Sequence, residues 1–323
     1  MEKERIVIYK VRAFGDKLNV TFDFIRENWR PMLKYMTYMM LPLACVLGVT
    51  LSKFMTIYTK LLVDQKEPDS YAGVAITYGL TILIYALATL LLSTVVYSLM
   101  RIYRERKNRL ENLTYADLKP TFWRMFKRML ILGLVFLVLY VLAIVLIIGL
   151  AALTPWTLLL TIPALLVCII PLAYWMPSYM FEDISVFAAL EKSYRLGFPT
   201  WGGIVLIIIV LGFLSTAISS IASIPWSVGL VVYTLLSESN NGNVPVLLEF
   251  LMYLLTVVQA YCSLVVSSLG LVGMAFQYGH AADKIDGITM DRNIENFEQL
   301  GDDNIDAPEV MGMDNEFDDF DKL

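Results

Sequence analysis

Glu249 and Gln259 are polar side chains within an otherwise apolar stretch of this 323-residue chain. Ionisable and polar groups inside a membrane-crossing segment often have a function, because hydrocarbon does not solvate them. The two positions are ten residues apart, which places them about 80° apart around a helix, so they could line one side of a polar cavity. The alternative is a Glu at the interface in contact with water and a Gln bonded to a neighbouring helix.

Glu182 and Asp183 are adjacent carboxylates that could attract a cation, although a helix cap would explain them equally well. Residues and motifs typical of catalytic or metal sites are otherwise scarce. The sequence has one His, His280, and no phosphate-binding Gly-rich loop, zinc-protease motif, Cys pair at metal-ligand spacing or nucleophile elbow. We therefore expect no catalytic site, metal or cofactor, and we expect core packing for the three cysteines, Cys45, Cys168 and Cys262.

The composition indicates a membrane protein. Hydrophobic residues make up 58% of the chain and charged residues 17%, and the mean hydropathy is +0.64, which does not suit a water-exposed surface. A helix needs about 20 apolar residues to cross a bilayer core of about 30 Å. Stretches without Asp, Glu, Lys or Arg predict an all-α polytopic bundle of six transmembrane helices, at about residues 33–54, 75–100, 129–152, 156–180, 201–224 and 249–277.

Prolines decide two of these boundaries. Thr154 and Pro155 divide the long uncharged stretch 129–181 into two helices that form a tight hairpin. Pro225 is predicted to end the fifth span, which leaves 226–236 as a partial or interfacial helix, because that piece is about half the length needed to cross back. Kinks or local unwinding are expected at the prolines inside the other spans, Pro42, Pro163 and Pro171.

Small residues recur at steps of three and four along the fifth and sixth spans. Small faces let helix backbones approach closely in lipid, so this spacing predicts that the two spans adjoin. The hydroxyls could instead line a pathway for a polar solute. The residues are Gly212, Thr216, Ser219 and Ser223 in the fifth span, and Ala260, Ser263, Ser267 and Gly270 in the sixth.

Basic residues predict the orientation. Of the 25 Lys and Arg residues, 22 lie on one side of the six predicted spans, which places both termini in the cytoplasm under the positive-inside rule. Residues 1–285 then form a membrane domain with an N-terminal amphipathic helix, and 286–323 form an acidic tail.

The acidic tail accounts for the formal charge of −5. It has few apolar residues, so we expect it to be disordered. Its aromatic residues, set among carboxylates, could anchor it to a basic protein partner, or it could fold back over the basic membrane domain. The basic cluster at 101–109 is interpreted as binding anionic lipid, and no nucleic-acid partner is expected.

A short pattern precedes the first, third and fifth spans, in the form Leu, then Ser or Thr, then an aromatic residue. It predicts three repeats of a cytoplasmic interfacial elbow helix followed by a transmembrane hairpin. Aromatic and basic residues near these entries predict contact with anionic lipid headgroups. The candidate interface residues are Trp29, Arg30, Trp123, Arg124, Lys127, Arg128 and Trp201.

The stretch from Glu182 to Gly197, followed by Trp201 and a long apolar run, resembles the signature of a six-span bacterial membrane family. That family is related to the membrane domain attached to some glycerophosphodiester phosphodiesterases. The resemblance implies an elbow helix before each hairpin and a location in the bacterial cytoplasmic (inner) membrane, and most members have no assigned activity. It implies no catalytic residue in this chain.

These observations lead to three hypotheses. The first is a non-enzymatic scaffold or envelope-maintenance component that interacts with lipid and protein partners. The second is a transporter or lipid-translocating protein that uses the face formed by Glu249 and Gln259. The third is an enzyme acting on lipid headgroups, in which Glu182 and Asp183 hold a metal.

Overall fold

The computed structural model of the protein describes residues 5–62, 70–106, 108–154, 156–239 and 244–289. These residues contain no strand, and six of their helical segments are long and apolar enough to cross a membrane. The predicted all-α class with six spans is therefore confirmed, and the chain is a multi-pass membrane protein. The elements are α1 (Phe14–Leu62), α2 (Tyr71–Glu105), α3 (Tyr115–Leu153), α4 (Thr157–Ile169), a 3-10 turn (Ile170–Tyr174), α5 (Trp175–Phe181), α6 (Val186–Gly197), α7 (Trp201–Ser239) and α8 (Val246–Asp286).

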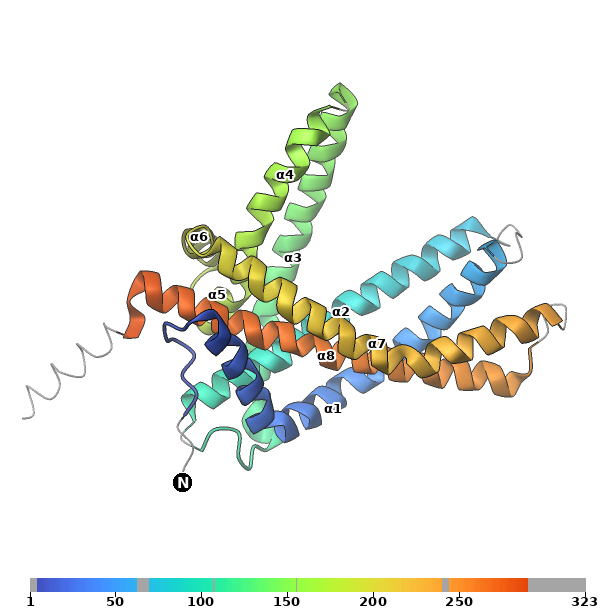
Figure 1. Ribbon diagram of the computed structural model, residues 1–323, viewed down its shortest axis with the longest axis horizontal. Coiled ribbons are helices and arrows are strands. Elements are labelled where there is room, and N and C mark those ends of the chain that lie inside the picture. Colours follow the sequence, from blue (N-terminus) through green and yellow to red (C-terminus); the bar gives the residue numbers. More distant parts are fainter. Residues whose placement is uncertain (1–4, 63–69, 107, 155, 240–243, 290–323) are drawn as a thin grey trace, which may run out of the picture.

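Three helical hairpins diverge from one packed end of the molecule (Figure 1). We call that end the hub; it consists of residues 5–13, α5, α6 and the adjoining ends of the long helices. The arms are the α1–α2, α3–α4 and α7–α8 hairpins beyond it. In the most apolar 18-residue stretch of α3, 6% of the residues are buried, compared with 39% in the corresponding stretch of α1. The α3–α4 arm therefore depends on lipid to cover its apolar surface.

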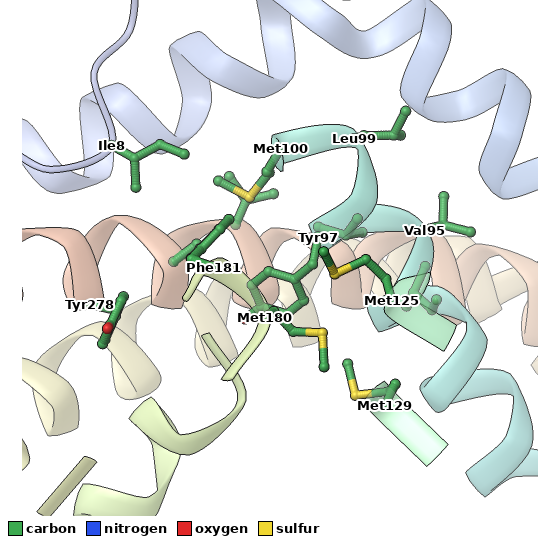
Figure 2. Packing of buried hydrophobic residues seen from close by; sticks show 14 of the residues in the cluster. Ile8, Val95, Tyr97, Leu99, Met100, Met125, Met129, Met180, Phe181 and Tyr278 are labelled. Carbon is green, nitrogen blue, oxygen red and sulfur yellow. The ribbon is translucent and has the colours of Figure 1, made fainter. Parts of the chain in front are cut away.

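The hydrophobic core is concentrated in the hub, where residues distant in sequence pack together (Figure 2). Tyr97 of α2 meets Phe181 of α5 edge to face, with ring centroids 5.4 Å apart. Met125 of α3 and Met180 of α5 are also buried in this cluster. Flexible methionine side chains fill irregular gaps between helices that cross at different angles.

The N-terminal segment 6–13, which we call the strap, lies across the hub end of α8. Ile8 and Tyr9 are buried, and the backbone N–H of Val11 donates to Asp283 at 3.0 Å. A Cβ atom on Gly279 would lie 2.2 Å from the carbonyl oxygen of Ile8. Glycine at this position therefore lets the strap backbone touch α8 directly.

The segments predicted to be three repeats differ in conformation. In the first, Asn28 interrupts α1 with non-helical torsion angles, and its side chain donates to the carbonyl of Phe24 at 2.9 Å. In the second, the corresponding residues run on within α3. In the third, α6 is a separate helix, capped by Ser185. The repeat remains a prediction.

The predicted end of the fifth span at Pro225 is wrong, because α7 continues to Ser239. Proline is tolerated in a membrane helix when neighbouring groups compensate for the lost hydrogen bond. Beyond Pro225 the helix is held by α8, since Trp226 donates to the hydroxyl of Thr256 at 3.0 Å. Local unwinding does occur at Pro171, which lies in the 3-10 turn.

Helix α8 has a standard C-terminal ending. Gly287 follows α8 with a φ of 67°, a left-handed conformation that glycine adopts without steric cost. The predicted acidic tail lies outside the described residues from position 290 onward.

Candidate functional site

Helices α7 and α8 pack antiparallel over an extensive interface, which confirms the predicted contact between the fifth and sixth spans. The contact is close at two levels. Towards the hub, a Cβ on Gly273 would meet Leu211, and towards the tip, a Cβ on Gly229 would meet Met252. Between these two levels the helices leave a groove.

The groove has a volume of about 320 Å³, near the small end of the range for ligand sites. The antiparallel register places Ser215 opposite Ser267, Ser219 opposite Ser263, and Ser223 opposite Gln259. Small side chains on both helices leave the space that larger residues would fill. The complete lining is Tyr85, Ser215, Thr216, Ser219, Ser220, Ser223, Gln259, Ser263 and Ser267.

The described residues that line the groove are polar, and the phenol of Tyr85 is the one ionisable side chain among them. Ser223 and Ser267 donate to carbonyls of their own helices, at 2.8 and 2.7 Å. Among the described residues, no protein group forms a hydrogen bond with the amide of Gln259. The side chain is partly buried, so its amide is left to bond with water or with a ligand in the groove, because an unpaired amide in apolar surroundings costs free energy.

The structure separates the two predicted intramembrane polar residues. Gln259 lines the groove. Glu249 lies in the first turn of α8, near the tip of the arm, where it is exposed and does not line the groove. A carboxylate there interacts favourably with the positive end of the helix dipole.

Asp183 is the centre of an ion-pair cluster that joins the first two hairpins. Arg101 of α2 donates to its two oxygens at 3.1 and 3.3 Å, and Arg124 of α3 donates at 2.6 Å. The side chain of Arg101 is only 8% exposed, so Asp183 supplies the counter-charge that this buried guanidinium needs.

Hydrogen bonds from Arg101 hold the pKa of the Asp183 carboxyl below its usual range. The positive charges of Arg101 and Arg124 act in the same direction, and they outweigh burial, which raises the pKa. Asp183 therefore stays ionised well into the acidic range. The carboxylate predicted as a possible cation ligand binds arginine instead.

Glu182 joins α6 and α8. Lys192 of α6 lies 2.8 Å from both of its oxygens, and the hydroxyl of Tyr278 on α8 donates to the same carboxylate. Asp286, at the end of α8, pairs with Lys192 at 2.9 Å and with Arg195 at 3.0 Å. Both members of the Glu182 and Asp183 pair thus hold the hub together.

A buried polar chain in the hub is not evident from the sequence patterns. Lys17 of α1 is 5% exposed and donates to Gln277 of α8 at 2.8 Å. Gln277 donates to the hydroxyl of Tyr174 at 3.0 Å, and Tyr174 in turn lies 3.0 Å from the hydroxyl of Thr200. The available signal was a pair of polar residues, Tyr174 and Gln277, within uncharged stretches.

The candidate interface residues fall into two groups. Trp29, Trp123 and Trp201 are exposed at the hub entries of α1, α3 and α7. Arg30 and Lys127 are exposed beside the first two, and the guanidinium of Arg30 lies 5.4 Å from the ring centroid of Trp29.

Arg124 and Arg128 are used within the fold. Arg124 binds Asp183, as described above. Arg128 stacks 4.0 Å from the ring centroid of Tyr179 and donates to the carbonyl oxygens of Tyr179, Glu182 and Ile184. It therefore holds the connection between α5 and α6, a role that satisfies backbone carbonyls at a helix end.

No family model, no curated protein and no solved structure matches this chain. The resemblance to the six-span family therefore remains a prediction.

Proposed function

We propose that this protein is a non-enzymatic scaffold of the bacterial cytoplasmic membrane that binds anionic lipid at its hub. The observation that carries the proposal is the set of three exposed tryptophans, Trp29, Trp123 and Trp201, where the hub meets the arms. Tryptophan favours the headgroup level, because its ring is apolar and its N–H needs a polar partner. Arg30 and Lys127 add exposed positive charge at the same level.

The charged groups of the hub support a structural role. The carboxylates of Glu182, Asp183 and Asp286 are engaged by basic side chains from α2, α3 and α6. A rigid hub of this kind holds three apolar hairpins in a fixed arrangement. The apolar arms and the exposed basic residues beside the hub are surfaces that suit lipid.

The same proposal includes the orientation. The hub end of the helices carries most of the Lys and Arg residues, so under the positive-inside rule it faces the cytoplasm. The described residues begin at Arg5 and end at Thr289, both of which contact the hub, and under this orientation the acidic tail that follows is cytoplasmic. A tail in that position is available for a basic protein partner.

Tryptophan depth tests the placement of the hub. We expect the fluorescence of Trp123 to be quenched more strongly by quenchers at the headgroup level than by lipids that carry bromine near the ends of their acyl chains. The measurement compares the fluorescence of the full chain with that of Trp123→Phe in lipid vesicles, so the difference isolates Trp123. A matched variant, Phe136→Trp, adds a ring about 20 Å further along α3 and should show the opposite preference. Equal depth for both rings would contradict the placement.

Lipid translocation is the second candidate, and the groove is the observation that favours it. A passage across the membrane must cover a core of about 30 Å. The hydroxyl row from Ser215 to Ser223 covers about 12 Å of that depth, at 1.5 Å per residue. This length fits a binding site better than a complete pathway.

A further inference from the structure

The groove between α7 and α8 is separate from the basic hub, and it has its own chemistry. We infer that it binds a neutral lipid alcohol, meaning an uncharged amphiphile whose hydroxyl group enters the groove between Ser219, Ser263 and Gln259. Its apolar body then lies along the arm in the bilayer. This inference goes beyond the proposed scaffold function and does not depend on it.

The amide of Gln259 points to a hydrogen-bonding ligand. It has two donors and an acceptor, and within the described part of the chain none of them is used by another protein group. Ser219 and Ser263 line the groove on opposite helices one turn further towards the hub. A hydroxyl placed among these three side chains can donate to one of them and accept from another. A purely apolar lipid tail would leave the amide unpaired.

The lining also selects against charge. No Asp, Glu, Lys, Arg or His contributes to the described groove. A phosphate or ammonium headgroup there would lose its hydration without gaining a counter-charge, which costs far more than moving a neutral hydroxyl. Charged lipids are therefore expected at the hub surface and uncharged lipids in the groove.

The position and shape of the groove favour an amphiphile over a soluble molecule. It lies near the middle of α7, between the close contacts at Leu211 and Gly229. Thr216 and Ser220 are exposed at its mouth, so it opens on the surface of the arm rather than into a sealed core. A ligand that reaches this depth from the side arrives through lipid.

Photolabelling tests the inference. The full chain is placed in phosphatidylcholine nanodiscs that contain a diazirine analogue of dioleoylglycerol, irradiated and digested, and the labelled peptides are identified by mass spectrometry. We expect label on the peptides that contain residues 211–229 and 252–273. Excess unlabelled dioleoylglycerol should remove it, whereas excess phosphatidic acid with the same chains should not.

Variants separate the groove from general contact with lipid. Gln259→Leu removes the amide at similar volume, and Ser219→Leu fills the space, so each should lower groove labelling at least about fivefold. Ser227→Ala is the matched control, because Ser227 lies on the same helix outside the groove and bonds to the carbonyl of Ser223. Its labelling should equal that of the natural sequence.

Three outcomes would overturn the inference. Labelling unchanged by both groove variants would mean that the lipid touches the arm without using the groove. Equal competition by phosphatidic acid would contradict the requirement for a neutral headgroup. If the natural sequence is folded, as shown by a thermal midpoint equal to that of Ser227→Ala, and neither α7 nor α8 is labelled, then water and not lipid occupies the groove.

Discussion

Asp183→Asn is expected to destabilise the hub by about 1–3 kcal/mol. Removing one partner of a buried ion pair costs about 3–5 kcal/mol, because the other charge stays buried. The side chain of Asp183 is 52% exposed while that of Arg101 is 8% exposed, so solvent screening reduces the expected cost. The thermal midpoint of the purified protein, followed by intrinsic fluorescence, should fall by several degrees.

The matched control is Asp23→Asn, which removes the same charge from an exposed position of α1 that makes no ion pair with another described residue. We expect its thermal midpoint to stay within about 1 °C of the natural sequence, since isolated surface substitutions change stability little. Equal midpoints for the two variants would show that Asp183 does not organise the hub.

Acid should produce a related effect in the natural sequence. The pKa of Asp183 is held below its usual range, first by hydrogen bonds from Arg101. A carboxyl whose pKa is lower in the folded than in the unfolded state stabilises the fold above the unfolded pKa, which is about 3.9. That stabilisation is lost as the pH falls through the folded-state pKa. Asp183→Asn should therefore flatten the decline in thermal midpoint below about pH 4.

Gly279→Ala is expected to displace the N-terminal strap from α8. The added Cβ would lie 2.2 Å from the carbonyl oxygen of Ile8, and a backbone atom cannot move aside as a flexible side chain can. Overpacking of this kind costs about 1–3 kcal/mol. Trypsin should then cleave after Lys10 or Arg12 at least about tenfold faster, because cleavage follows local opening of the strap.

The control for this substitution lies on the same helix. A Cβ on Gly270 meets nothing within 4 Å, so Gly270→Ala should be neutral or stabilising by about 0.5–1 kcal/mol through helix propensity. The two substitutions are chemically identical, but only Gly279→Ala should destabilise the protein and speed cleavage of the strap. Strap cleavage that is equally slow in both proteins would mean that the close contact at Gly279 does not hold the strap.

Local sequence patterns were sufficient to predict the six membrane spans and the contact between one pair of helices. Stretches without charge predicted six membrane-crossing helices, because the hydrocarbon core requires long apolar segments. The rows of small residues that include Ser219 and Ser263 predicted contact between α7 and α8, which is the arrangement found. The same rows were read mainly as packing faces, but together they leave the groove.

Other features depend on contacts that local patterns do not contain. Pro225 predicts a helix end, but the hydrogen bond from Trp226 to Thr256 of α8 is among the contacts that hold the continuing helix. The sequence does not indicate the strap, because its apolar run, Ile6 to Tyr9, is only four residues long within a charged segment, and Gly279, which Ile8 contacts, is far away in the sequence.

The hub was the hardest part to anticipate. Arg101 and Asp183 are 82 residues apart, so nothing in the spacing of either residue indicates the pair. Two adjacent carboxylates suit a metal site as well as an ion-pair cluster, and only the positions of the surrounding arginines decide between them. Arg128 shows the same limit, since a basic residue beside aromatic ones suggested lipid contact but serves the α5–α6 connection.

Binding of phosphatidylglycerol by the full chain tests the scaffold proposal most directly. The protein is released from nanodiscs at increasing salt concentrations, and native mass spectrometry measures the lipid that stays bound. Each exposed basic residue near an anionic surface contributes about 1 kcal/mol, so Arg30→Gln combined with Lys127→Gln should weaken binding about 10- to 30-fold. Lys53→Gln, on an exposed residue far from the hub, is the control. The account predicts a preference for phosphatidylglycerol over phosphatidylcholine that declines with salt and is lost only in the double variant. Equal retention of both lipids, or equal binding by both variants, would contradict it.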